Sequence, residues 1–290
     1  MNQHLFTVDL EDYFHVSAFE PLIPRDEWSR FAPRVRLGTE RLLDLLAAHQ
    51  STATFFVLGW VARHDPELIR RVHEAGHEVA SHTYWHRRIS TVTPAELKQD
   101  LLDSKAAIED ACGAEVTGFR APSFSLVPGT EWAFDVLLEC GFQYDSSIFP
   151  ITRPGYGYPG APLDPYVIDR PAGRLLEIPL SVLRIGGARI PAAGGGYLRH
   201  FPIGLLQQAF RQRARAGSPG VFYIHPWELD PDQPRLDVGT LTRMRHYRGL
   251  SQVAPRVATL LKEFRFSSIK AWLPSMSATL STDRPVYESI

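Results

Sequence analysis

Short strand-like runs alternate with amphipathic segments along most of the chain. Most of the strand-like runs are short and apolar, as buried strands are. They occupy residues 5–8, 53–58, 77–80, 118–120, 143–147, 175–180, 221–224 and 267–271. Segments with apolar residues at helical spacing occupy residues 39–49, 65–75, 93–112, 130–140 and 258–264. Strands that alternate with helices in this way favour a parallel sheet, here closed into a barrel.

Local signals mark the ends of two of these helices. Thr93-Pro94-Ala95-Glu96 is a capping box with proline at the first helical position. Asp65-Pro66 opens another helix, and Gly76 follows that helix in the position where glycine commonly ends one.

Three segments interrupt the alternation and are rich in proline or glycine, at residues 16–35, 149–173 and 186–196. Long loops in a compact domain tend to be functional. The chain has no internal repeat and no low-complexity linker, so it predicts one domain over residues 1–290. We expect a core at about residues 3–230 and a C-terminal extension at about residues 231–290 that packs on it, with a polar tail from residue 275.

Composition narrows the class of protein. A length of 290 residues, 44% hydrophobic and 22% charged, is typical of a globular protein with a sizeable core. The formal net charge of −1 gives no general attraction for nucleic acid or anionic membranes. The first residues lack the pattern of a signal peptide, and no apolar stretch approaches the roughly 20 residues of a membrane helix. Cys112 and Cys140 are expected to be reduced thiols. These features favour a cytoplasmic enzyme.

Polar side chains that suit catalysis follow several of the predicted strands. They are Asp9, Glu11 and Asp12 after the first strand, His82 and His86 after the third, then Arg120 and His225. In parallel α/β barrels the chemistry collects at the carboxyl ends of the strands. We therefore expect these residues to share one face of the barrel.

His82 and His86 are four residues apart and would lie on one face if the backbone there is helical. Carboxylates from the end of the first strand could then complete a divalent-metal site of the His/His/carboxylate kind. An H-x-x-x-H pair is a weak signal by itself, so this prediction depends on the other strand-end residues.

The chain resembles the NodB-type polysaccharide deacetylases (carbohydrate esterase family 4), and within them the branch associated with exopolysaccharide and exosortase gene clusters. The motifs occur in the family's order and the resemblance spans most of residues 3–270. The residues that carry it are Thr7–His15, Ala53–Gly59, Gly76–His86, Phe119–Ser125, His225–Asp230 and Arg245–Arg248.

The resemblance implies a distorted (β/α) barrel with long loop insertions and a set of site residues. It implies that Asp9 is the catalytic base, that Arg120 holds this base, and that His225 is the acid. It also implies that His82 and His86 bind a metal. The third ligand stays open: an Asp-x-Asp register nominates Glu11, whereas Asp12 keeps the residue type one position further on. Zinc is the expected ion, and cobalt, nickel or iron suit the same ligands.

This chemistry suits an amide. A metal with an open position acidifies water and polarises a carbonyl, the base takes the water proton, and the acid protonates the departing amine. The backbone N–H of Ser123 is the candidate partner for the oxyanion. We expect removal of N-acetyl groups from N-acetylhexosamine residues of an exopolysaccharide or its precursor, with an N-acetylated glycan as the binding partner. The alternatives are an allantoinase-like cyclic amide hydrolase and a carbohydrate-binding protein without catalysis.

Overall fold

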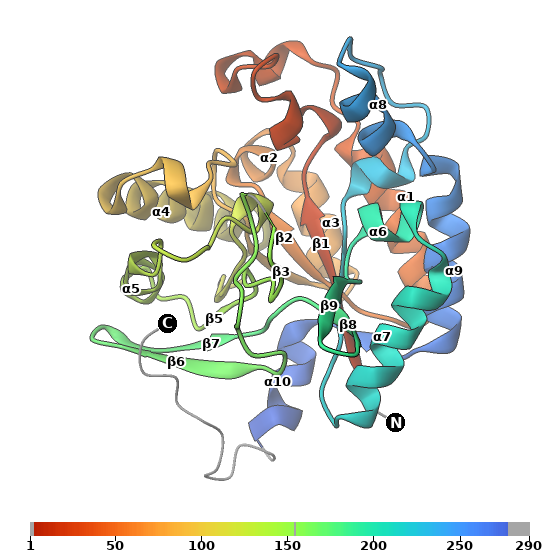
Figure 1. Cartoon of the computed structure of the whole chain (residues 1–290). Helices are drawn as coiled ribbons and strands as arrows, with labels where there is room; N and C mark the ends of the chain where they lie inside the picture. Colours follow the sequence, from red (N-terminus) through yellow and green to blue (C-terminus); the bar gives the residue numbers. More distant parts are fainter. Residues whose placement is uncertain (1–2, 154, 278–290) are drawn as a thin grey trace.

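A computed structural model describes residues 3–153 and 155–277. Its main sheet has nine strands in the order β10-β1-β2-β3-β4-β5-β7-β6, and β11 also pairs with β1. All pairs in this sheet are parallel except β6 with β7. Helices α1 and α9 lie together on one side of the sheet, and α4 and α5 lie together on another (Figure 1).

The elements follow the predicted alternation. The strands are β1 His4–Leu10, β2 Thr54–Val57, β3 Glu78–Ser81, β4 Gly118–Phe119, β5 Tyr144–Asp145, β6 Tyr166–Arg170, β7 Gly173–Glu177, β8 Val182–Ile185, β9 Ala188–Pro191, β10 Val221–Ile224 and β11 Phe266–Ser267. The α-helices are α1 Val35–Ala48, α2 Gly59–His64, α3 Pro66–Glu74, α4 Pro94–Cys112, α5 Trp132–Glu139, α6 Gly195–His200, α7 Ile203–Arg215, α8 Thr240–Tyr247, α9 Val253–Glu263 and α10 Ile269–Ser277.

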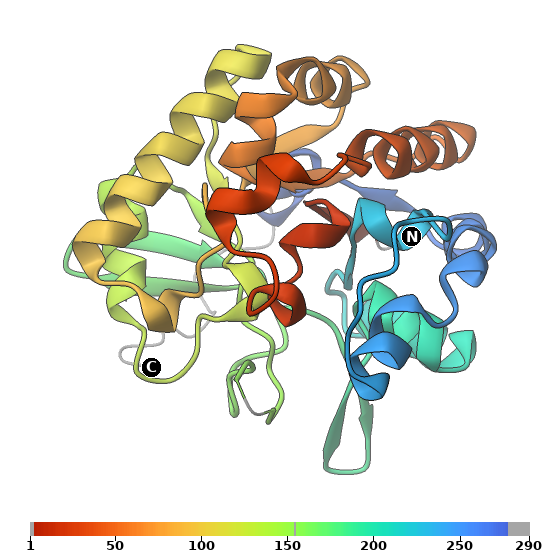
Figure 2. The same cartoon turned by 90° about the horizontal axis from the view of Figure 1, so that it is seen from above.

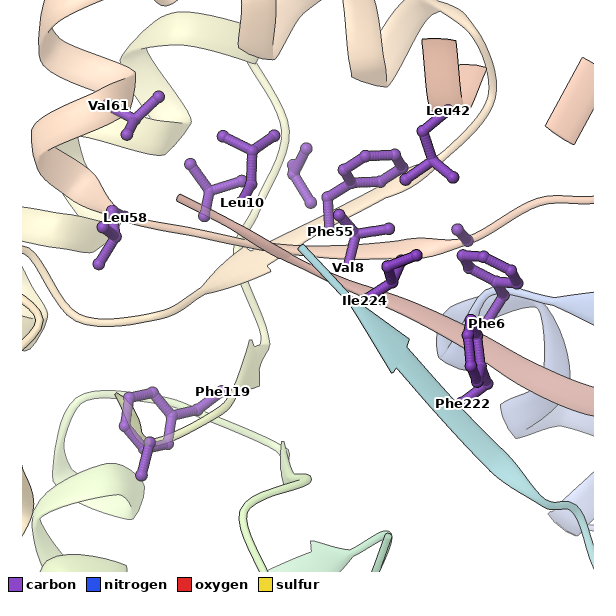
Figure 3. Packing of buried hydrophobic residues seen from close by; sticks show 14 of the residues in the cluster. Phe6, Val8, Leu10, Leu42, Phe55, Leu58, Val61, Phe119, Phe222 and Ile224 are labelled. Carbon is purple, nitrogen blue, oxygen red and sulfur yellow. The ribbon is translucent and has the colours of Figure 1, made fainter. Parts of the chain in front are cut away.

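Strand β1 is buried on both faces. Toward the end of the strand, its apolar side chains lie on one face and its polar side chains on the other. Phe6, Val8 and Leu10 belong to the larger apolar core. Figure 3 shows Val8 and Leu10 on the side of the strands that faces Leu42 of α1. Because side chains along a strand point to alternate faces, the intervening Thr7 and Asp9 point toward the inside of the barrel.

The two ends of the sheet are joined by irregular structure. Strands β10 and β6 are at the two ends of the strand order. On the far side of β10, Gly194 makes an isolated parallel bridge with Tyr223. Val221 N–H also donates to Ser181 Oγ over 2.7 Å. The predicted fold is confirmed as a distorted α/β barrel with parallel strands. The hairpin of β8 and β9 projects from this body (Figure 2).

Local helix signals were reliable. Helix α4 begins with the predicted capping box, in which Thr93 Oγ1 accepts from Glu96 N–H while the Glu96 carboxylate accepts from Thr93 N–H. Helix α3 begins at Pro66 with Asp65 as its cap, as predicted.

Several segments differ from what the sequence pattern predicts. The segment 149–173 contains β6, which pairs with β7 despite the surrounding prolines and glycines. The glycines at 194–196 do not form a loop throughout, because α6 begins at Gly195. Residues 59–64, to which no element was assigned, form α2. Residues 267–271 add only a short β11 to the sheet before α10 begins at Ile269.

The C-terminal part packs on the barrel as far as the structure describes it. Val253, Val257 and Leu260 of α9 are buried, and this helix contacts α1. The assignment of residues 1–290 to one domain stays a prediction, and residues 278–290 of the expected extension and tail lie outside the described residues. In the described part of the chain, no helix is long and apolar enough to cross a membrane.

Candidate active site

The predicted site residues meet at a cavity of about 450 Å³. This volume is in the range of small-molecule binding sites. The ends of strands, residues 16–18 of the segment 16–35, and the C-terminal part all contribute to its wall. The lining residues are Asp9, Glu11, Val16, Ser17, Ala18, His82, His86, Arg88, Ser123, Phe124, Gly155, Tyr156, Tyr223, His225, Trp227 and Arg245.

Glu11, His82 and His86 form a compact buried cluster. Each offers one ligand atom, and these atoms lie within 4.8 Å of one another. The backbone between the histidines is a turn and not a helix, which corrects the shared-face reasoning. Thr83 and His86 have left-handed φ values of 65° and 52°, a conformation that costs a non-glycine residue on the order of 1–2 kcal/mol. The turn is held by the hydrogen bond from His86 N–H to Thr83 Oγ1, 3.1 Å long.

The free atoms of this cluster suit a divalent cation. His82 Nδ1 lies 2.8 Å from the carbonyl oxygen of Arg120, which leaves Nε2 available. Glu11 Oε2 is buried without a hydrogen-bond partner among the described residues, although it lies 3.3 Å from His86 Nε2. Burial lowers the pKa of both histidines, so each imidazole is held in the neutral form that binds metal.

Asp12 is not part of the cluster. One of its oxygens accepts from Tyr13 N–H, and the other accepts from Arg34 N–H and from Val35 N–H over 2.8 Å. Burial raises the pKa of Asp12 to about 6. The geometry therefore does not support Asp12 as the metal carboxylate, because its two oxygens accept hydrogen bonds from backbone N–H groups at both ends of the segment that leads from Tyr13 to Val35.

Asp9 is held by Arg120 inside the barrel. The Arg120 guanidinium is fully buried and donates from Nη1 to Asp9 Oδ1 and to Thr7 Oγ1, 2.7 Å in each case. It also donates to the carbonyl and hydroxyl of Ser146 over 2.9 Å. Burial opposes ionisation of Asp9, but the charge and hydrogen bond of Arg120, with a contribution from His225, outweigh it and hold the pKa of Asp9 below its ordinary value. The carboxylate is thus ionised and oriented.

His225 lies between two carboxylates. Its Nε2 is 3.1 Å from Glu11 Oε1 and 3.9 Å from Asp9 Oδ2, and its Nδ1 is 3.0 Å from Glu228 Oε2. Burial favours the neutral ring, but hydrogen bonds and charge from Glu11 and Glu228 raise the pKa of His225 to about 10. Without a bound cation this imidazole carries a proton at neutral pH.

Ser123 also lines the cavity. This is the position that Ser123 must occupy if its backbone N–H is to contact the oxyanion. Ser123 and Phe124 both have left-handed backbone, with φ of 55° and 52°. The Ser123 and Ser17 hydroxyls are 2.6 Å apart, so the insertion is tied to this turn. Strained backbone of this kind tends to occur at functional sites.

Comparisons with known proteins relate two parts of this chain to described families. Residues 32–144 match the family model described as "Polysaccharide deacetylase", and residues 146–274 match one described as a domain of unknown function. The match to the polysaccharide deacetylase family thus covers less than half of this chain. The candidate site combines residues from both matched ranges with Asp9 and Glu11, which precede them.

Curated proteins are similar to this chain over about a third of its length. A "Chitooligosaccharide deacetylase" of Bradyrhizobium sp. (strain ANU 289) is 40% identical over 99 residues, which are 34% of this chain and 43% of the relative. A "Peptidoglycan-N-acetylglucosamine deacetylase" of Bacillus cereus is 37% identical over 105 residues, which are 36% of this chain and 47% of the relative. The matched part thus spans less than half the length of these relatives.

Solved structures share the fold of this chain. A protein from Mycobacterium smegmatis assigned as a polysaccharide deacetylase superposes with a TM-score of 0.61 at 20% identity, over 100% of this chain and 96% of that one. A family 4 carbohydrate esterase from Streptomyces lividans, in complex with acetate, gives a TM-score of 0.50 at 17% identity, over 92% and 91%. The predicted resemblance to the deacetylases is confirmed, while its exopolysaccharide branch stays a prediction.

Sequence reasoning missed several residues of the candidate site. Glu228 is fully buried and joins His225 to Arg199, whose Nε donates to Glu228 Oε1 over 2.8 Å. Its position was a usable signal: Pro226 favours a short helical turn after His225, and in such a turn a side chain three residues further on, here Glu228, comes back to His225. Arg245 lies in a segment that carries the resemblance but was assigned no role, and nothing local distinguishes Arg88 from a surface arginine.

Proposed function

We propose that the protein is a metal-dependent hydrolase that removes N-acetyl groups from N-acetylhexosamine residues of a glycan, with an exopolysaccharide or its precursor as the expected substrate. The observation that carries this proposal is the grouping of three buried metal-type ligands, an arginine-held carboxylate and a protonated histidine at one cavity. The match to the polysaccharide deacetylase family supports the same reaction class.

Glu11, His82 and His86 would hold the divalent ion. The unpartnered Glu11 Oε2 and the free Nε2 of His82 are the atoms that support this assignment. Two imidazoles and one carboxylate are typical of catalytic zinc sites, and the same ligands also suit cobalt, nickel or iron. The ion, when bound, supplies a Lewis acid that acidifies water and polarises the amide carbonyl.

Asp9 is assigned as the general base. It lines the cavity, and its pKa below the ordinary value keeps it ionised and able to take a proton from the attacking water. Arg120 acts through Asp9 as a positioning residue: it spends two nitrogens on Ser146 and one on Asp9, so the carboxylate cannot rotate away.

His225 is assigned as the general acid. An amine leaves poorly as an anion, so the C–N bond breaks productively when the nitrogen receives a proton, which the imidazolium of His225 can give. The backbone N–H of Ser123 is the proposed partner for the charge that develops on the carbonyl oxygen. Water and the N-acetyl group yield acetate and a free amino sugar.

The test measures acetate release from N-acetylated oligosaccharides, with and without chelator and added zinc. Glu11→Gln is expected to lose zinc affinity by about 10-fold or more together with activity. Asp12→Asn is the matched control: it is expected to lose thermal stability but to keep its zinc stoichiometry.

Three results would contradict the proposal. Equal zinc affinity in Glu11→Gln and the unmutated protein would remove the metal assignment. Ring opening of allantoin without acetate release would favour a cyclic amide hydrolase. Glycan binding that His82→Ala leaves intact, with no turnover by either protein, would favour a carbohydrate-binding protein. The predicted cytoplasmic location stays a prediction.

A further inference from the structure

Two arginines line the cavity beside the groups assigned to catalysis. Arg88 follows the turn that carries His86, and Arg245 belongs to α8 in the C-terminal part of the chain. The two are far apart in sequence, yet both face the space in which the substrate must lie. Their guanidinium groups have fixed positive charge at every pH at which proteins fold.

Neither arginine has a carboxylate partner in residues 3–153 and 155–277. Arg88 is half-buried, and its Nε is buried without any hydrogen-bond partner in that part of the chain. Other arginines near the cavity are paired: Arg120 with Asp9, Arg199 with Glu228, and Arg25 with Glu20. A buried guanidinium nitrogen that has lost water and gained no partner is unfavourable. A ligand that accepts its hydrogen bond would remove this cost.

The acidic groups of the cavity do not neutralise the two arginines. Asp9 Oδ1 is bound by Arg120 Nη1 at 2.7 Å, and Glu11 Oε1 lies 3.1 Å from His225 Nε2, so neither carboxylate faces Arg88 or Arg245. The charges of Arg88 and Arg245 therefore remain in excess. A divalent cation at the Glu11 cluster would add to this excess of positive charge, which favours an anionic ligand.

From this we infer that the natural substrate carries an acidic group, a carboxylate or a phosphate, on or next to the N-acetylated sugar, and that Arg88 and Arg245 bind it. This inference rests on the proposed deacetylase function and narrows its substrate class. The planar guanidinium presents paired donors that match both carboxylate and phosphate oxygens. A neutral N-acetylglucosamine polymer would leave both charges without a partner.

The experiment compares three N-acetylated substrates by acetate release. Chitotetraose is the neutral substrate, a tetrasaccharide of alternating glucuronate and N-acetylglucosamine supplies a carboxylate, and UDP-N-acetylglucosamine supplies phosphate. We expect kcat/KM for one of the acidic substrates to exceed that for chitotetraose by about 100-fold, because each of the two arginines adds a charge-assisted hydrogen bond that provides about 10-fold. The preferred acidic substrate identifies the source of the charge.

Arg88→Gln and Arg245→Gln test the two side chains. Each is expected to lower the ratio of acidic to neutral kcat/KM by about 10-fold, mainly through KM. Arg87→Gln and Arg243→Gln are matched controls, because Arg87 adjoins Arg88 and Arg243 lies on α8, but neither lines the cavity. Both controls are expected to keep the unmutated ratio.

Salt provides a measurement that needs no variant. Raising NaCl from about 0.02 M to about 0.5 M shortens the Debye length severalfold and should lower kcat/KM for the acidic substrate more than for chitotetraose. Turnover of chitotetraose at least as fast as both acidic substrates, with ratios unchanged in Arg88→Gln and Arg245→Gln, would overturn the inference and leave the deacetylase function standing. Acetate release from none of the three would overturn the proposed function itself.

Discussion

Glu228 offers the sharpest test of how the buried charges of this site work. Its Oε1 accepts from Arg199 Nε, while its Oε2 accepts from the backbone N–H of His225 and faces Nδ1 of the same residue. Glu228→Gln keeps the shape but leaves one acceptor oxygen in place of two. The new NH2 group must point its hydrogens at a donor, either Arg199 or His225.

The magnitude follows from these contacts. Breaking a buried ion pair by removing one partner costs about 3–5 kcal/mol. Arg199 keeps the carbonyl oxygens of His246 and Arg248 as partners at 2.6 and 3.1 Å. We therefore expect the low end, a loss of about 3 kcal/mol in the free energy of unfolding. Because a general acid contributes about 100-fold or more to rate, misorientation of His225 should lower kcat by about 100-fold.

The pH profile has a definite direction. Burial lowers the pKa of His225, and the hydrogen bonds and charges of Glu11 and Glu228 raise it to about 10. Removing the charge of Glu228 lowers that pKa, so the acid form is lost at lower pH. The alkaline limb of the kcat profile should move toward lower pH. KM should change little, because Glu228 does not line the cavity.

The assay is acetate release as a function of pH, paired with urea unfolding. Glu263→Gln is the matched control, since Glu263 is exposed and pairs with Arg211; it should cost no more than about 1 kcal/mol and leave kcat unchanged. If Glu228→Gln kept kcat within about threefold and an unmoved alkaline limb, the role assigned to Glu228 would be wrong.

Three further predictions concern the base, a buried acid pair and the metal. Asp9→Asn should lower kcat by about 10²–10⁴-fold with zinc stoichiometry unchanged, and near-normal turnover would contradict the base assignment. Glu177 lies opposite Asp145, and burial followed by the charge of Asp145 raises the pKa of Glu177 well above 4.5. Between these two pKa values the folded chain keeps a proton on Glu177 that the unfolded chain releases. The contribution of Glu177 to the free energy of unfolding is therefore full below pH 4.5 and is lost as pH rises toward the raised pKa. Glu177→Gln should reduce the fall of Tm with pH, and equal slopes would refute it. Chelation should lower Tm by several degrees, reversibly with zinc, and an unchanged Tm would speak against a bound ion.

The local elements and the meeting of the strand ends could be predicted from the sequence. Capping at Thr93 and Glu96 acts within one helical turn, so its signal is contiguous. The alternation of Val8 with Asp9 follows from the strand period of two, whatever the rest of the fold does. Parallel strands bring their carboxyl ends to one edge of the sheet. For this reason the sequence alone predicts that Asp9, His82, Arg120 and His225 lie close together.

The preference for Glu11 over Asp12 in the proposed metal site comes from tertiary structure, because both residues follow the end of β1 and no local pattern distinguishes them. The amides of Arg34 and Val35, more than twenty residues away, take Asp12 and leave Glu11 facing the imidazoles. Arg88 and Arg245 likewise become neighbours of the cavity only through the packing of distant segments. Periodicity fixes which face a residue occupies, whereas partners across long sequence separations depend on how the whole chain packs.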